Sequence, residues 1–202
     1  FGRRQANTSN GRRVSSATAY LEPARKRPNL SVLTDAHAQR VVIEDGRAIG
    51  VDLIERGQPI RILANRETIL CAGAIGSPQL LMLSGVGERG ALAEHGIKPT
   101  IDLPGVGRNL QDHIVVTTQY STSTTVPYGI SWRSWPWLAW QVARYPWSGK
   151  GLLANMMLHA GGFVRSRPGL SRPDVQIILV PTAISTNGRM GFGHGFGLMA
   201  SL

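Results

Sequence analysis

Residues 71–90, CAGAIGSPQLLMLSGVGERG, support two incompatible interpretations. Gly85, Gly87 and Gly90 have the spacing G-x-G-x-x-G of a dinucleotide-binding fingerprint, in which the preceding residues form a strand and the glycines hold a pyrophosphate. Two features oppose that interpretation. A βαβ unit needs about 30 residues, and Ser77-Pro78 is typical of a helix start at the place where the strand would lie. We therefore expect a helix that starts there and ends at Gly85, with the glycines serving turns.

The composition is that of a globular protein without a membrane span. The chain has 202 residues, of which 42% are hydrophobic and 17% charged, so it can bury a core. No apolar run approaches the roughly 20 residues of a transmembrane helix, and the first residues lack the apolar segment of a signal peptide. Cys71 is the single cysteine, which excludes an internal disulfide. We expect a cytoplasmic or membrane-peripheral protein.

The net charge of +10 raises the question of an anionic partner. Basic residues crowd the first 27 positions, but the stacking platform that nucleic-acid binding needs is missing there. We therefore expect no nucleic-acid partner. The charge instead indicates a solvated surface, or a face toward an anionic cofactor or another domain.

The order of expected elements indicates a mixture of helices and antiparallel strands. We expect a short helix over residues 15–27 capped by Ser15 or Ser16, and a strand over 29–34. A three-stranded meander over 39–63 follows, with a type I′ turn at Asp45-Gly46. The apolar run 67–74 predicts a buried strand that ends in small residues. A second short helix is expected over 90–96, and then an irregular segment to residue 113.

After residue 113 the composition becomes richer in β-forming residues. Strands are expected within residues 114–125, 159–166, 174–181 and 196–202. All five Trp lie in residues 132–147, where Pro136 starts a helix with Trp137, Trp140 and Trp147 roughly on one side. A lid or packing helix explains this stretch better than a membrane anchor, so membrane association is possible but not favoured. The histidines show no metal-ligand spacing, so no metal is expected.

Several blocks, in order, resemble the glucose–methanol–choline (GMC) oxidoreductases, which are flavin-dependent alcohol oxidases and dehydrogenases. The similarity covers essentially the whole chain and is far more specific than one glycine fingerprint. The blocks are residues 11–42, 73–87 (GAIGSPQLLMLSGVG), 103–113 (LPGVGRNLQDH), 160–176 (AGGFVRSRPGLSRPDVQ) and 193–196 (GHGF).

The resemblance implies an α/β (mixed α+β) fold in two parts. Residues 1–113 would be the middle of an FAD-binding domain of the two-dinucleotide type, with its antiparallel β-meander. Residues 114–202 would be the first part of an antiparallel-sheet substrate domain. The family's N-terminal pyrophosphate loop and C-terminal catalytic His block are not in this sequence. The chain is therefore expected to be the middle of a longer enzyme and inactive alone.

The implied activity is oxidation of the CH–OH group of a small alcohol, with hydride transfer to N5 of FAD; the electron acceptor stays open. Two alternatives also stay open. One is a hydroxynitrile lyase-type relative with a non-redox flavin, and the other is a non-catalytic module that binds a nucleotide or a membrane surface.

The resemblance also implies supporting residues. Ala38 stands where members commonly have Val, whose backbone meets the adenine edge, and Ala72 and Gly73 would pass close to the same half of FAD. Members that handle choline carry a Glu after a Gln-aromatic pair; here Ser121 follows that pair, which favours a neutral alcohol and places Ser121 near the pocket wall. Asp112-His113 are expected as junction residues rather than an acid–base pair. No catalytic residue is expected in this chain.

Overall fold

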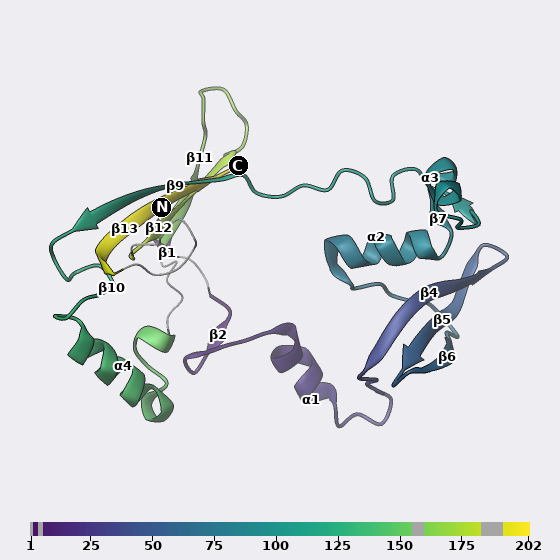
Figure 1. Ribbon diagram of the computed structural model, residues 1–202, viewed down its shortest axis with the longest axis horizontal. Coiled ribbons are helices and arrows are strands. Elements are labelled where there is room, and N and C mark those ends of the chain that lie inside the picture. The colour runs from purple at the N-terminus through teal and green to yellow at the C-terminus, as the bar shows by residue number, and fades with distance from the viewer. Residues whose placement is uncertain (1, 4–5, 155–159, 183–191) are drawn as a thin grey trace. The chain divides into compact units, whose positions relative to one another are not determined.

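The chain forms two compact units. The computed structural model describes residues 2–3, 6–154, 160–182 and 192–202. Residues 27–112 make one unit, and residues 1–26 with 113–202 make the other (Figure 1). The division falls between Asp112 and His113, and the assignment of the two parts to an FAD-binding domain and a substrate domain stays a prediction. Residues 1–26, expected to belong with the residues up to 113, group with the C-terminal part instead, where β1 (Gly2–Arg3) pairs with β11 (Ala160–Val164).

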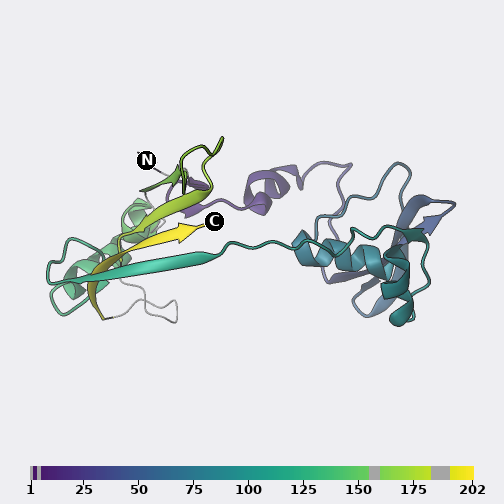
Figure 2. The same ribbon diagram turned by 90° about the horizontal axis from the view of Figure 1, so that it is seen from above.

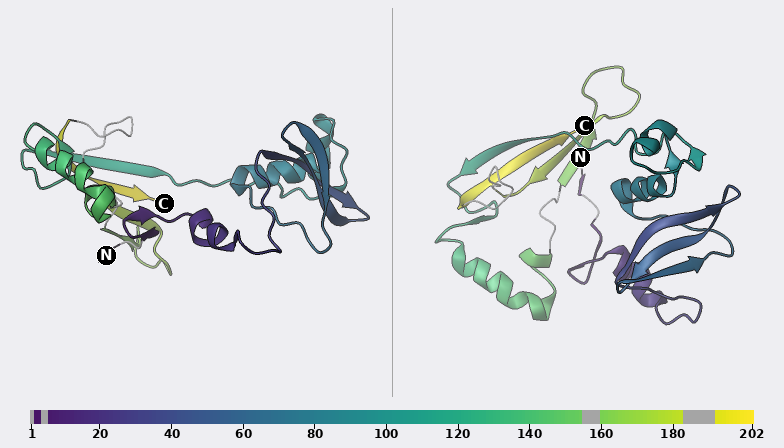
Figure 3. Two further views of the ribbon diagram at one scale, coloured as in Figure 1. Left: turned by 90° about the horizontal axis from the view of Figure 1, so that it is seen from below. Right: turned by 45° about the vertical axis from the view of Figure 1, so that its right-hand side comes forward.

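The predicted meander is confirmed as an antiparallel sheet of three strands. They are β4 (Ala36–Glu44), β5 (Arg47–Glu55) and β6 (Gln58–Leu63), in that spatial order (Figure 3). Asp45 and Gly46, between β4 and β5, both have positive φ values, 48° and 75°. Two positive φ values are what a type I′ turn requires, and this turn matches the twist of the flanking strands.

Helix α2 (Gly73–Leu83) packs against β4. Its first residue, Gly73, lies five residues before Pro78, the predicted first helical residue, so the expected N-cap at Ser77 is wrong. The Ser77 Oγ instead accepts a hydrogen bond from the Ala72 N–H, 3.0 Å away, from inside the helix. Pro78 lies inside the helix, and Gly85 ends it in the left-handed region at φ 82°, as predicted.

Two expected strands, over residues 29–34 and 67–74, do not form in the described part of the chain. Ile69, predicted to be buried, is 73% exposed. A strand exists only where its N–H and C=O groups find partners. No strand of the described residues pairs with either segment, so β-forming side chains alone do not make a sheet there.

The segment with the glycine fingerprint forms no phosphate-binding loop. The residues before Gly85 are helical, and β7 (Val86–Gly87) pairs with β8 (Ile101–Asp102) in a short parallel ladder. Helix α3 (Arg89–Glu94) follows β7, and its first N–H donates to the Asp102 carboxylate, 3.1 Å away. A carboxylate of the chain itself therefore occupies the position that the pyrophosphate interpretation required.

Gly85 brings two backbone segments close together. Its carbonyl accepts hydrogen bonds from the N–H groups of Thr100 (2.7 Å) and Ile101 (3.1 Å). A Cβ added at Gly85 would lie 2.6 Å from both the Lys98 carbonyl oxygen and Thr100 Oγ1. The glycine is therefore required by packing and by its positive φ.

The second unit is built on an antiparallel sheet whose order is β1-β11-β12-β13-β10, with β9 also paired to β13 (Figure 2). Its expected strands are confirmed as β9, β11, β12 and β13. The bounds of the remaining elements in this sheet are β9 (Val115–Thr122), β10 (Gly129–Ile130), β12 (Val175–Val180) and β13 (Gly193–Ser201). The Trp-rich helix is α4 (Trp135–Ser148), with Pro136 in its first turn as predicted, and a 3₁₀ turn, Leu152–Ala154, follows.

The N-terminal residues contribute a small hairpin and a short helix to this unit. The hairpin consists of β2 (Thr8–Ser9) and β3 (Arg12–Arg13). A π-helical turn, Ala17–Leu21, continues into α1 (Glu22–Ala24), which is shorter than the expected helix over 15–27. Ser15 caps it: its Oγ accepts from the Thr18 N–H while the Ser15 N–H donates to Thr18 Oγ1.

We expect Gly85→Ala to lower the free energy of unfolding by about 2 kcal/mol or more, because the new methyl group meets backbone at a positive φ. Gly90→Ala is the matched control: Gly90 lies in α3, and an added Cβ there meets no atom within 4 Å. The control should leave stability unchanged or raise it by up to about 1 kcal/mol. Urea unfolding followed by circular dichroism measures both. Equal effects of the two changes would contradict the packing role of Gly85.

Candidate cofactor-binding site

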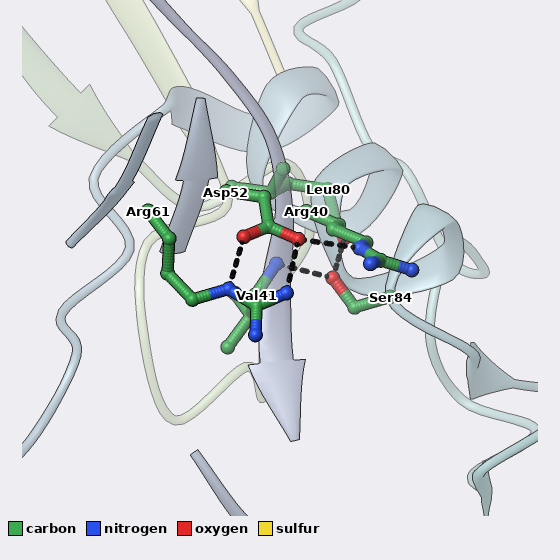
Figure 4. Close-up of polar contacts among 6 residues, drawn as sticks. All are labelled: Arg40, Val41, Asp52, Arg61, Leu80 and Ser84. Carbon is green, nitrogen blue, oxygen red and sulfur yellow. Dashed lines mark hydrogen bonds and ion pairs between the residues drawn. The ribbon is translucent and has the colours of Figure 1, made fainter. Parts of the chain in front are cut away.

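The Ser84 hydroxyl joins helix α2 to strand β4. It accepts a hydrogen bond from the Val41 N–H at 2.8 Å and donates one to the Leu80 carbonyl at 2.5 Å (Figure 4). Strand β4 is an edge of the meander, and among the described residues no strand pairs with it on the side of the Val41 N–H. Val41 and Leu80 are both buried. One side chain thus fixes the position of the edge strand relative to the end of the helix.

Asp52 ties the three meander strands together across their exposed face. Its carboxylate accepts from Arg40 Nε on β4 (2.9 Å) and from Arg61 on β6, through Nε at 2.6 Å and Nη2 at 3.0 Å (Figure 4). The three residues lie opposite one another in the register of the sheet. The hydrogen bonds from Arg61, and then those from Arg40, lower the pKa of Asp52 to about 2.

The structure places the three expected cofactor residues in the same unit, and all three residues are exposed. Ala38 lies on β4, opposite Leu53 and beside an irregularity in the ladder. Ala72 precedes α2, and its N–H is used by Ser77. Gly73 is the first residue of α2, with φ 80°, and a Cβ added there meets no atom within 4 Å. Small side chains therefore leave open space at the start of α2.

Two cavities flank α2 in this unit, and the three cofactor candidates line neither. One, of about 480 Å³, lies where β4 meets the end of α2 and includes the cations Arg40, Arg61 and Lys98. The other, of about 720 Å³, lies between α2 and residues 105–111. A Cβ added at Gly107 would lie 3.2 Å from the sulfur of Met82, so this glycine lets the second segment approach the helix.

Ser121, the expected pocket residue, lies on β9 opposite Gly195 of β13 and is exposed. The adjacent pair, Tyr120 and Phe196, stacks with ring centroids 5.2 Å apart. Alternation along β13 puts Ser121 and Gly195 on one face of the sheet and His194 on the other. A role for Ser121 near a substrate therefore stays a prediction. Such a substrate would lie on the face of the sheet opposite to His194.

His194 was not singled out from the sequence, yet the structure places it in a buried polar cluster. Its Nδ1 lies 2.9 Å from the Pro127 carbonyl oxygen, and its Nε2 lies 2.8 Å from Ser131 Oγ. A carbonyl only accepts, so Nδ1 carries the proton, and in the neutral ring Nε2 accepts from the Ser131 hydroxyl. Both nitrogens are engaged, so His194 anchors β13 to the loop before α4 rather than offering a free base.

A cavity of about 370 Å³ lies beside His194. Tyr128 and Trp137, whose rings stack at 6.2 Å, form part of its wall together with Arg133. The local sequence gives one sign of this site: glycines flank His194 on both sides, and Gly129, its partner in the ladder, meets the backbone of β13 at close range.

No metal centre is evident among the residues that the structure describes, where no group of three or more His, Cys, Asp and Glu side chains comes together. Asp112 and His113 fall at the division between the two units, and their role as junction residues stays a prediction. The single cysteine, Cys71, is free and exposed.

Comparison with known proteins identifies the family. Residues 1–115 match the family described as GMC oxidoreductase. The chain belongs to the GMC oxidoreductases. The alcohol dehydrogenase [acceptor] of Pseudomonas putida is 40% identical over 197 residues, 96% of this chain and 36% of that protein. The oxygen-dependent choline dehydrogenase of Rhizobium meliloti (strain 1021) is 44% identical over 199 residues, 97% of this chain and 36% of that protein. This GMC chain thus spans about a third of the length of the curated relatives it matches.

Solved structures agree on the fold of this GMC chain. Pyridoxine 4-oxidase from Mesorbium loti matches with a TM-score of 0.74 and 25% identity, over 96% of this chain and 35% of that one. Formate oxidase matches with a TM-score of 0.80 at 23% identity, over 96% of this chain and 38% of that one, which bears on the fold alone. The resemblance inferred from sequence and the mixed helix-and-sheet fold are therefore confirmed.

Because Asp52 has a lowered pKa, its ion pairs stabilise the folded chain above the ordinary pKa of 3.8 and are lost as the pH falls to about 2. We expect Asp52→Asn to unfold at lower urea concentration than the parent chain at pH 7, by an amount that stays constant down to about pH 4 and shrinks between pH 4 and pH 2. Urea midpoints across this range test it. A difference that grows in acid would contradict the prediction.

Proposed function

We propose that the chain is part of an FAD-dependent oxidoreductase that oxidises the CH–OH group of a small alcohol. Family membership supports this reaction class. The observation that carries the cofactor assignment is the geometry around β4 and α2: Ser84 at the end of the helix holds the edge strand, and the start of the same helix has open space at Gly73. FAD bound here would supply the flavin ring that takes up the hydride of the alcohol.

In this proposal the chain's own residues bind the adenosine half of the cofactor. The backbone of Ala38 offers N–H and C=O groups on an edge strand, which suits a flat polar ring and tolerates Val in place of Ala. With only a methyl group at Ala72 and no side chain at Gly73, the start of α2 lets the ligand approach the backbone. Ser84 keeps the strand and the helix at a constant separation.

We expect Ala72→Leu, introduced into the complete flavoprotein, to lower FAD occupancy by about tenfold or more, because the larger side chain would fill the space beside the ligand. Ala93→Leu is the matched control, since Ala93 is an exposed alanine on α3 in the same unit. The ratio of absorbance at the flavin band to that at the protein band measures occupancy. Equal occupancy in the two variants would contradict the assignment of Ala72.

The substrate we propose is a neutral alcohol rather than choline. The unit that includes Ser121 carries thirteen Lys and Arg against two acidic residues, Glu22 and Asp174. A quaternary ammonium group needs a carboxylate or aromatic faces to replace its lost hydration. Ser121 supplies a hydroxyl, which can hydrogen-bond a neutral alcohol but offers no charge to a cation.

In the complete enzyme we therefore expect kcat/KM to be higher for neutral primary alcohols than for choline. Ser121→Glu should raise kcat/KM for choline by about tenfold through a new charge contact. Thr117→Glu is the control, since Thr117 is exposed on the same strand and face, four residues away. A clear preference of the parent enzyme for choline would contradict the substrate class. Reduction of the flavin by no alcohol at all would favour a lyase-type relative.

A further inference from the structure

Helix α4 presents its apolar side to solvent and its polar side to the protein. The inward residues recur at helical spacing: Ser134 and Gln141 are buried, and the Tyr145 hydroxyl donates to the Gly11 carbonyl at 3.0 Å. Gln141 Oε1 accepts from the N–H of Leu152, 3.3 Å away. This arrangement is the reverse of an ordinary amphipathic surface helix, whose apolar stripe faces the core.

The outward side of α4 is dominated by tryptophan. Trp135 is 60% exposed, Trp140 62% and Trp147 86%, and Trp132, just before the helix, is 85% exposed. The other outward positions between them are Pro136, Ala139, Val142, Ala143 and Pro146, so no charged side chain interrupts this face. Apolar patches of this kind mark interaction surfaces.

Cations lie near both ends of this helix. Arg133 precedes α4 and Lys150 follows it, and both are exposed. The turn of the β2–β3 hairpin lies against the C-terminal end of α4 through the Tyr145–Gly11 hydrogen bond, which brings the exposed Arg12 and Arg13 to that end. No Asp or Glu occurs in the sequence between residues 113 and 173, so the face has no carboxylate from its own segment.

We propose that the outward face of α4, with the four cations Arg12, Arg13, Arg133 and Lys150, docks this unit on a membrane surface that contains anionic lipid. Trp favours the headgroup boundary because its ring is apolar while its N–H needs a polar partner. Basic residues beside such a face add attraction to anionic headgroups. A second copy of the chain fits less well, since it would place two strongly cationic units against each other.

The contact would be peripheral. In the described residues no helix has the length and apolarity needed to cross a bilayer, and α4 itself has 14 residues. The helix therefore lies in the plane of the surface and buries its Trp side chains at the level of the headgroups. This inference does not depend on the proposed reaction, and lipid binding is measured without substrate or flavin.

Vesicle co-sedimentation of the full chain tests the proposal. We expect binding to phosphatidylcholine vesicles with about 30 mol % phosphatidylglycerol, a blue shift of Trp emission on binding, and release in about 0.5 M salt. Trp140→Ser with Trp147→Ser should weaken binding by about tenfold or more. The control is Tyr20→Ser with Phe163→Ser, two exposed aromatic residues of the same unit outside α4.

The charge contribution is tested separately. Arg12→Gln with Arg13→Gln should weaken binding to the anionic vesicles several-fold, and Arg47→Gln with Arg56→Gln, in the other unit, should leave it unchanged. Circular dichroism confirms that each variant is folded as the parent.

Three results would overturn the proposal. The first is equal binding by the parent and the Trp variant. The second is equal binding to vesicles with and without phosphatidylglycerol. The third is a dimer in sedimentation velocity that Trp140→Ser with Trp147→Ser dissociates, which would assign the face to a second copy instead.

Discussion

The unit of residues 27–112 depends on a hydrogen-bond partner for the backbone of β4, the edge strand of its meander. A buried N–H without a partner costs free energy comparable to a lost hydrogen bond, and Val41 presents such a group on the edge strand β4. Ser84 satisfies it and returns its own proton to Leu80, so both ends of the hydroxyl are used. Gly85 then adopts a left-handed conformation that ends the helix, and β7 follows directly. The Gly85 carbonyl accepts a hydrogen bond from the Thr100 N–H. Two consecutive residues, Ser84 and Gly85, therefore connect the end of α2 to the edge strand β4 and to the β7–β8 ladder.

Local signals in the sequence predicted the parts that local chemistry determines. Asp45-Gly46 specified its turn, and Gly85 and Gly96 ended their helices, because each residue tolerates the conformation its position requires. The segments 29–34 and 67–74 failed for the opposite reason. A strand depends on a partner elsewhere, and β-forming side chains do not supply one. Ser77 shows a third case. It was predicted as the N-cap, but it lies inside α2, where its hydroxyl accepts a hydrogen bond from the N–H of Ala72, the residue before the helix.

The residues of the candidate site also differ in how far the sequence could predict them. Ala38, Ala72 and Gly73 could be named only through the resemblance, since small residues carry little information about a ligand by themselves. His194 escaped prediction because its partners, Pro127 and Ser131, lie 67 and 63 positions away, and only the pairing of β13 with β10 brings them together. A buried histidine with both nitrogens engaged is recognised from contacts, whereas its neighbours in sequence are glycines compatible with any close-packed strand.

The two units also use charge differently, which bears on where each meets its surroundings. Residues 27–112 carry nine Lys and Arg and ten Asp and Glu, and pairs such as Asp52 with Arg61 and Glu88 with Arg108 neutralise them internally. The other unit has thirteen cations and two carboxylates, and one of these, Asp174, already accepts hydrogen bonds from Ser166. Its cations therefore have few anions of the unit to pair with. A helix that exposes tryptophan beside unneutralised cations is consistent with a surface shaped for an external anionic partner rather than for solvent alone.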